Sequence, residues 1–180
     1  IGSVQKTWPG RAPSGNPPSR AAVSGHVAVV TLQRPEARNA VSPALARALE
    51  AAVIACDEDR DVRAVILTGA GRAAFCAGAD LKEVAKGNAD GLYTARGGFA
   101  GFVYAERRKP WIAALNGAAL AGGLEIALAC DMIVALKSVE LGLPEVTRGL
   151  IAAAGGLHRR PAALPRNVAI EMIATGRRLD

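Results

Sequence analysis

Residues 109–131 read KPWIAALNGAALAGGLEIALACD, and this stretch decides the fold. The apolar run over residues 111–115 predicts a strand. Residues 116–121 predict a turn, and a helix opens near Gly122 and ends by Cys130. A strand that passes through a short turn into a helix is typical of α/β domains with crossover connections.

The segments before this stretch repeat the alternation of strands and helices. Residues 26–32 (HVAVVTL) and 64–68 (AVILT) predict two earlier strands. Between them, Ser42 predicts a helix N-cap, since Pro43 follows at the first helical position. Three residues spaced four apart give this helix an apolar face: Leu45, Leu49 and Val53.

The rest of the chain continues the α/β pattern over shorter elements. We expect a charged connection at 57–61, a short helix from about residue 80, a helix over about 94–108, a buried strand at 132–135, an extended piece at 139–141, and helices at about 151–159 and 165–175. Residues 1–25, rich in Gly, Pro, Ser and Arg, predict an irregular arm before one core domain over 26–180. No internal repeat is visible.

The net charge of +6 favours anionic partners such as phosphorylated cofactors, nucleic acid or acidic membranes, although a solvated basic surface explains it equally well. Nucleic acid is disfavoured because no aromatic residues interleave with the short basic clusters. The three cysteines form no C-x-x-C pair, so no zinc site or disulfide framework is indicated, and we expect reduced thiols in a cytoplasmic protein.

The N-terminal residues lack the apolar core of a signal peptide. The longest apolar region, residues 111–136, contains Asn116, Glu125 and Asp131. These polar residues favour a buried core segment over a membrane span.

Two loops of small residues each precede a predicted helix: Ala77-Gly78-Ala79 and Ala121-Gly122-Gly123. Helix N-termini have free N–H groups at the positive end of the dipole, and small residues let a ligand approach the backbone. Facing each other, the loops could aim two N–H donors at one carbonyl oxygen as an oxyanion hole. Tight turns and close helix packing would explain the same glycines.

Glu125 and Glu145 are isolated carboxylates in apolar surroundings, and two such groups in one cleft could divide acid and base work. Each also has a structural explanation, as a solvated helix position or a favourable residue at a helix N-terminus. Asp80 fits a helix cap, and Asp131 fits a structural hydrogen bond.

The chain has no G-x-S-x-G, Walker or complete G-x-G-x-x-G motif, and its two histidines give a serine or cysteine triad little support.

Several segments together resemble the enoyl-CoA hydratase/isomerase (crotonase) superfamily. The segments are RPEARNA (34–40), LTGAGR (67–72), FCAGADLKE (75–83), KPWIAALNG (109–117), AGGLEIALACD (121–131), LPEV (143–146) and residues 149–156. The resemblance covers about residues 26–180. It implies an α/β fold of the ClpP/crotonase type, a spiral of β-β-α units.

The resemblance also implies the site residues. The oxyanion hole would be formed by the N–H groups of Ala79 and Gly122, and Glu125 and Glu145 would be the catalytic glutamates. Ala77 and Ala79 would lie near the adenine of coenzyme A. The residues implied to bind the substrate or its CoA portion are Arg38, Ala77, Gly78, Ala79, Asp80, Leu81, Lys82 and Gly122.

The implied reaction is hydration of an enoyl-CoA in fatty acid metabolism, as in β-oxidation. Glu125 would activate water for attack at the β-carbon, and Glu145 would deliver a proton to the α-carbon. No metal is implied, and CoA enters as part of the substrate. Isomerisation, thioester hydrolysis, decarboxylation and a non-catalytic homologue that binds RNA or protein remain alternatives.

The resemblance implies a chain longer than 180 residues, whose missing helical part supports a homotrimer or a dimer of trimers. Ala121 stands where many members of the superfamily carry another glycine. We expect this difference to be tolerated if the backbone there does not need a positive φ angle.

Overall fold

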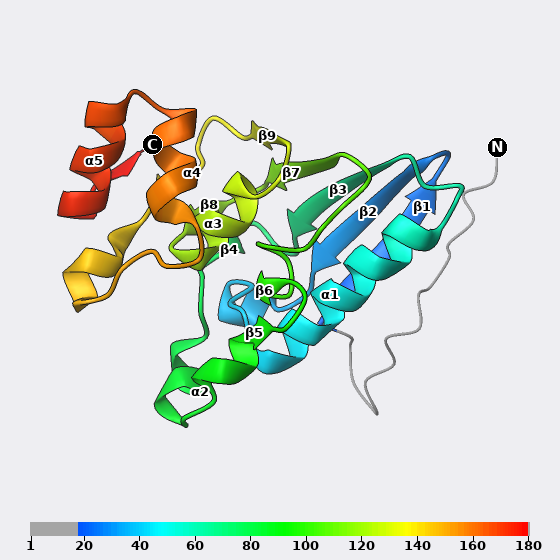
Figure 1. Cartoon of the computed structure of the whole chain (residues 1–180), viewed down its shortest axis with the longest axis horizontal. Helices are drawn as coiled ribbons and strands as arrows, with labels where there is room; N and C mark the ends of the chain where they lie inside the picture. The colour runs from blue at the N-terminus through cyan, green and yellow to red at the C-terminus, as the bar shows by residue number, and fades with distance from the viewer. Residues whose placement is uncertain (1–17, 180) are drawn as a thin grey trace.

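The computed structural model describes residues 18–179 and contains a twisted five-stranded sheet (Figure 1). The strand order is β1-β2-β3-β7-β9, with β1 antiparallel to β2 and the other neighbours parallel. The strands are β1 (Ser19–Ser24), β2 (Val27–Leu32), β3 (Ala64–Gly69), β7 (Trp111–Leu115) and β9 (Met132–Ala135).

A second sheet has the order β11-β10-β8-β4. Its strands are β4 (Ala74–Cys76), β8 (Ala118–Leu120), β10 (Leu141–Gly142) and β11 (Arg178–Leu179). Along the chain, β3 of the first sheet is followed by β4 of the second and then by helix α2 (Leu81–Ala85). The order β7, β8, α3 (Gly122–Leu128) repeats this unit. The predicted spiral of β-β-α units is therefore confirmed.

The remaining helices lie at both ends of the molecule. Figure 1 shows α1 running beside the first sheet, while α4 and α5 lie at the opposite end. The α-helices among them are α1 (Pro43–Glu58), α4 (Gly156–Ala163) and α5 (Arg166–Thr175). The 3₁₀ helices are η1 (Pro35–Ala37), η2 (Ala89–Leu92) and η3 (Pro144–Arg148). Within residues 18–179, no helix is both long and apolar enough to span a bilayer.

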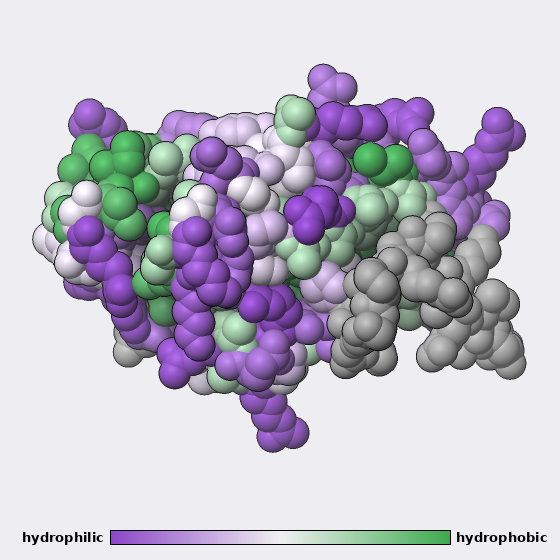
Figure 2. Space-filling model, turned by 90° about the horizontal axis from the view of Figure 1, so that it is seen from below, coloured by the Kyte–Doolittle hydropathy of each residue, from purple (hydrophilic) through white to green (hydrophobic). Residues whose placement is uncertain are grey.

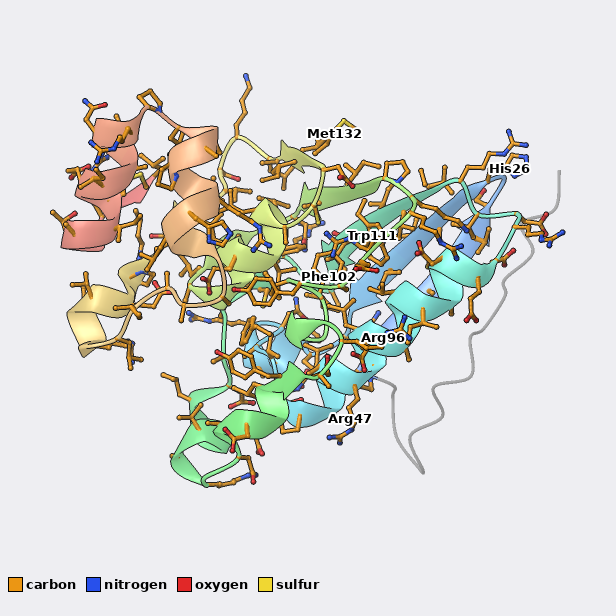
Figure 3. All side chains as sticks on the ribbon, in the orientation of Figure 1. His26, Arg47, Arg96, Phe102, Trp111 and Met132 are labelled. Carbon is orange, nitrogen blue, oxygen red and sulfur yellow. The ribbon has the colours of Figure 1, made fainter. Side chains whose placement is uncertain are left out.

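The core includes the apolar face of α1 and the first sheet, as the spacing in α1 predicts, and it extends to β4, β8 and α3. Leu45 and Leu49 are fully buried, and Val53 is 3% exposed. Trp111 packs edge-to-face on Phe102, with ring centroids 5.0 Å apart, near the centre of the molecule (Figure 3). Such aromatic pairs add about 1 kcal/mol beyond the area they bury.

The expected irregular arm over residues 1–25 is wrong for residues 19–24, which form strand β1. This strand pairs with β2 over its full length, from Ser19 opposite Leu32 to Ser24 opposite Val27. Antiparallel pairing across the tight turn that follows Ser24 satisfies backbone groups whatever the local composition. Residues 1–17 lie outside the described residues.

The helix expected over residues 94–108 is also wrong. The segment begins with a small hairpin of β5 (Tyr93–Thr94) and β6 (Gly98–Phe99). Gly98, Ala100 and Gly101 all have positive φ angles, which a right-handed helix cannot contain. A Cβ atom on Gly101 would lie only 2.4 Å from the Ala46 carbonyl oxygen, so this turn packs directly on α1.

Three shorter predictions need correction. The expected turn at 116–121 contains β8, whose three residues are too short to show a period. The expected connection at 57–61 begins inside α1, which continues to Glu58. Strand β9 is exposed rather than buried, because it forms an edge of the first sheet.

Apolar residues are also exposed near the C-terminal elements. Figure 2 shows hydrophobic surface at the end of the molecule that carries η3, α4 and α5. Val146, Leu150 and Ile151 contribute exposed side chains in this region.

The Ser42 cap yields a stability prediction. Its Oγ accepts a hydrogen bond from the Leu45 N–H at 3.2 Å, as the sequence predicts. Ser42→Ala should lower the free energy of unfolding by about 1 kcal/mol, because one N–H of the first turn loses its acceptor. Urea denaturation measures this, with the exposed Ser138→Ala as the matched control. Equal effects of the two substitutions would contradict the capping role.

Candidate active site

The loop between β4 and α2 is held against the chain that precedes α1. Val41 donates its N–H to the Gly78 oxygen at 2.8 Å, and the Asp80 N–H donates to the Val41 oxygen at 2.9 Å. These bonds place Ala79 beside Val41 in a parallel bridge. Among residues 18–179, the Ala79 N–H has no backbone acceptor, so it is available to a ligand.

Asp80 holds this loop in place. One carboxylate oxygen pairs with the Arg34 guanidinium at 2.9 Å, and the other accepts from the Lys82 N–H at 3.1 Å. Burial favours the neutral carboxyl, but Arg34 and the N–H groups of α2 together hold the pKa of Asp80 below its usual range. The predicted cap is confirmed, and the side chain has its partners within the protein.

The second loop lies directly against the first. A Cβ atom on Gly78 would lie 3.0 Å from both the Gly122 nitrogen and the Ala121 Cβ, so the two loops can meet this closely because Gly78 has no side chain. Gly122 is the first residue of α3, and its N–H has no backbone acceptor in the described chain. The structure therefore brings the N–H groups of Ala79 and Gly122 into neighbouring loops.

Ala121 turns the chain into α3 with φ 51° and ψ −129°. Its N–H donates to the Gly142 oxygen at 2.9 Å, and its carbonyl accepts from the Leu124 and Glu125 N–H groups. The position thus requires a positive φ angle, which is the condition under which alanine is strained. The condition under which alanine was expected to be tolerated, a backbone that needs no positive φ angle, is therefore not met at Ala121.

Glu125 lies in the first turn of α3 and is only 4% exposed. Its Oε1 accepts a hydrogen bond from the Gly156 N–H at 2.8 Å. Burial, opposed by this bond and reinforced by the charge of Glu145, raises the pKa of Glu125 to about 7. Glu125 is therefore a buried carboxyl that exchanges a proton near neutral pH, and the explanation as a solvated helix position is wrong.

Glu145 is half-buried at the start of η3. Its charge contributes to the raised pKa of Glu125, so the two carboxyl groups interact electrostatically. The C-terminal elements fix η3: the backbone after α5 packs against it at Gly176, and β11 pairs with β10 just before it. Residues far apart in sequence thus meet at one site.

Most residues expected to bind CoA lie in the loop that precedes α2 and in the start of α2, and Arg38 is joined to this loop because its carbonyl oxygen accepts a hydrogen bond from the Ala77 N–H at 3.1 Å. Arg38 and Lys82 are exposed, and Leu81 is half exposed, while Ala77 and Ala79 are partly buried. Exposed cations next to a small-residue loop suit a phosphorylated ligand. Binding by these residues stays a prediction.

Sequence reasoning missed Asn39, which is fully buried with φ 55°. Its Nδ2 donates to the oxygens of Ala70 and Ala74 at 3.0 and 2.9 Å, and its Oδ1 accepts from the Arg34 N–H at 2.9 Å. Asn39 therefore fixes the turn that precedes α1 against the start of β4. Asparagine tolerates left-handed backbone, so a turn prediction at this residue was the available signal.

Two other parts of the site were missed. The sequence predicts a helix over about residues 151–159, which would put Gly156 in its interior, whereas α4 starts at Gly156. Phe99 covers the Gly122 loop, since a Cβ on Gly122 would lie 2.5 Å from its ring. Neither contact has a sequence signal, because both depend on how distant segments pack.

Other polar groups have structural partners away from this site. Asp131 accepts from the Trp111 N–H at 2.7 Å, as expected for a structural hydrogen bond. His26 lies at the end of the first sheet away from α3 (Figure 3), and its ring Nδ1 is 2.8 Å from the Asp61 carbonyl oxygen. Within the described part of the chain, no group of His, Cys, Asp or Glu is arranged to hold a metal ion.

A cavity of about 460 Å³ lies elsewhere, between α1 and the segment that follows β6. Its lining mixes acidic and basic groups, including Glu50, Asp57, Arg96 and Arg108. Neither catalytic candidate borders it, so chemistry and geometry rather than cavity size identify the site around Glu125.

Comparisons with known proteins show what this chain is similar to. The profile of the enoyl-CoA hydratase/isomerase family matches residues 22–180. Mevalonyl-coenzyme A hydratase of Beauveria bassiana is 46% identical, over 84% of this chain and 58% of its own length. The curated relatives with the strongest matches share about 60% of their length with this chain.

Solved structures show the same similarity. An enoyl-CoA hydratase from Mycobacterium tuberculosis superposes with a TM-score of 0.86 at 42% identity, over 91% of this chain and 64% of its own. A carnitinyl-CoA hydratase from Mycobacterium avium gives a TM-score of 0.87 at 47% identity, over 92% and 64%.

The positive φ angle at Ala121 predicts that glycine at this position makes the protein more stable. Ala121→Gly should raise the free energy of unfolding by about 1 kcal/mol, because relief of strain exceeds the entropy that glycine adds to the unfolded chain. Thermal and urea denaturation measure it. Ala51→Gly, in the exposed middle of α1, is the matched control and should lower stability by about 1 kcal/mol. Loss of stability in both variants would show that Ala121 is not strained.

The raised pKa of Glu125 predicts a pH-dependent stability. The folded pKa lies above the unfolded value, so the protonated form stabilises the fold below the unfolded pKa and this stability is lost as pH rises through about 7. Glu125→Gln keeps an acceptor for Gly156 but cannot ionise. The free energy of unfolding of this variant should therefore exceed that of the parent by an amount that grows from near zero at pH 4 to about 3 kcal/mol at pH 8.

Urea denaturation at both pH values measures this difference. The exposed Glu36→Gln serves as the control and should show no such trend. A constant difference between the Glu125 variant and the parent at pH 4 and pH 8 would contradict the assignment.

Proposed function

Since this chain belongs to the enoyl-CoA hydratase/isomerase (crotonase) family, we propose that it adds water across the 2,3-double bond of an enoyl-CoA thioester. The observation that carries the proposal is Glu125, a buried carboxyl with a pKa of about 7 next to a second carboxyl. Hydration needs one group that accepts a proton from water and one that donates a proton to carbon.

The two N–H groups act on the thioester. When a nucleophile attacks the β-carbon, negative charge moves to the thioester oxygen. Donors from Ala79 and Gly122 stabilise this enolate-like state more than the substrate, which lowers the barrier. One donor in such a site contributes roughly 3 kcal/mol.

The carboxyl groups move the protons. Ionised Glu125 accepts a proton from water as the water oxygen bonds to the β-carbon, and Glu145 donates a proton to the α-carbon. The Gly156 N–H holds Glu125 Oε1 in place at 2.8 Å. A pKa near 7 suits proton exchange at neutral pH, because Glu125 is then ionised in a large fraction of the molecules and its carboxylate remains a competent base.

Coenzyme A is part of the substrate in this proposal, and no redox cofactor or metal takes part. Arg38 and Lys82 would contact its phosphates, and the loop over residues 77–82 would line its path, with Ala77 and Ala79 near the adenine. The exposed positions of the two cations support this arrangement.

Several finer points are part of the same proposal. A homotrimer or dimer of trimers, a cytoplasmic location and a role in fatty acid metabolism follow from the family resemblance. Double-bond isomerisation, thioester hydrolysis and decarboxylation would use the same N–H pair. The presence of both glutamates favours hydration, because one carboxyl would suffice for moving a proton between two carbons.

Substitution of either glutamate tests the roles. Glu125→Gln and Glu145→Gln should each lower kcat for crotonyl-CoA hydration by several orders of magnitude, because the proton acceptor or donor is lost. The dissociation constant for CoA should change little. Loss of absorbance of the conjugated thioester measures turnover, and Glu36→Gln is the control. Near-normal turnover in either variant would remove that residue from its role.

The ionisation of Glu125 adds a pH dependence. The acidic limb of kcat/KM for hydration should have an apparent pKa near 7, with activity falling as Glu125 becomes protonated at lower pH. A rate profile with no limb between pH 5 and pH 8 would argue against Glu125 as the base.

A further inference from the structure

An aromatic hairpin lies beside the candidate active site. Tyr93 of β5 and Phe99 of β6 are opposite each other across the two strands. Their rings pack edge-to-face, with centroids 5.5 Å apart and an interplanar angle of 64°. The Gly97 N–H donates to the Thr94 Oγ at 3.0 Å and closes the turn. The hairpin therefore presents Tyr93 in a defined position.

Phe99 anchors this hairpin on the N–H loop. Its ring is 3% exposed and occupies the space where a Cβ on Gly122 would lie, 2.5 Å away. Phe99 thus contacts both the Tyr93 ring and the space beside Gly122, which places the hairpin next to the Gly122 loop. A thioester held by the Gly122 N–H would have its acyl chain near this hairpin.

The hydroxyl of Tyr93 is available to a ligand. The side chain is 49% exposed, and no hydrogen bond joins its hydroxyl to another described residue. Burial and the charges of Glu125 and Tyr104 raise the pKa of this phenol, so it stays protonated and can donate.

We propose that Tyr93 determines acyl specificity, by hydrogen bonding to a hydroxyl or another neutral polar group on a short acyl chain. The inference rests on the proposed function and adds the class of acyl group. A neutral group is favoured over a carboxylate because ionised Glu125, the proposed base, already places negative charge at the site. A site built to bond a substrate hydroxyl discriminates against the analogue that lacks it.

Tyr104 provides a matched control, since it is the other exposed tyrosine of this region at 52%. Its hydroxyl lies 3.5 Å from the Ala153 oxygen, and the Arg159 guanidinium stands over its ring at 5.5 Å. The Tyr104 hydroxyl therefore has a partner within the protein, whereas the Tyr93 hydroxyl has none among the described residues.

The test compares two substrates that differ only in a terminal group, 5-hydroxypent-2-enoyl-CoA and hex-2-enoyl-CoA. The parent chain should show a higher kcat/KM for the hydroxylated substrate. Tyr93→Phe keeps the ring and removes the hydroxyl, so it should reduce this preference about tenfold. Turnover of crotonyl-CoA should be unchanged, and Tyr104→Phe should retain the preference.

Binding of the saturated analogues, 5-hydroxypentanoyl-CoA and hexanoyl-CoA, separates this inference from the proposed function. If no enoyl-CoA is hydrated but Tyr93→Phe still removes a preference for binding the hydroxylated analogue, the specificity role stands and hydration fails. If the parent shows no preference in turnover or binding, or if Tyr93→Phe affects both members of a pair equally, the inference is overturned.

Discussion

The contact between two loop backbones is the constraint on which the site depends. Gly78 and Gly122 approach so closely that a side chain on Gly78 would lie 3.0 Å from the Gly122 nitrogen. This approach is possible because β4 and β8 are parallel neighbours in the second sheet, so the segments that follow them leave at the same edge. The loops that carry the Ala79 and Gly122 N–H groups are thereby neighbours, at the expense of a strained backbone at Ala121.

Electrostatics at the site depend on the same packing. Glu125 is buried because α3 begins at this loop and the Gly155–Gly156 turn covers it from the C-terminal side. Desolvation then raises its pKa to about 7, and the nearby Glu145 adds to the effect. Glu125 would not have this raised pKa on a solvated helix, so the C-terminal elements contribute directly to the proposed chemistry.

Much of the fold could be predicted because its long elements have clear periods. Strands β2, β3, β7 and β9 and helix α1 follow from apolar runs and the Ser42 cap. Strands β4 and β8 are too short to show a period, and positive φ angles at Gly98 and Gly101 exclude the helix expected there. The pair of glutamates was predicted from their isolation in apolar stretches, and the family resemblance implied their separate roles, whereas the contacts of Phe99 and Gly156 arise only from long-range packing.

A crystal structure of this chain with acetoacetyl-CoA tests the central claim most directly. The account predicts that the thioester oxygen lies about 3 Å from both the Ala79 and Gly122 nitrogens, with the carboxyl groups of Glu125 and Glu145 beside the acyl carbons. A thioester bound away from these two N–H groups, or carboxyl groups that face away from the acyl chain, would contradict it.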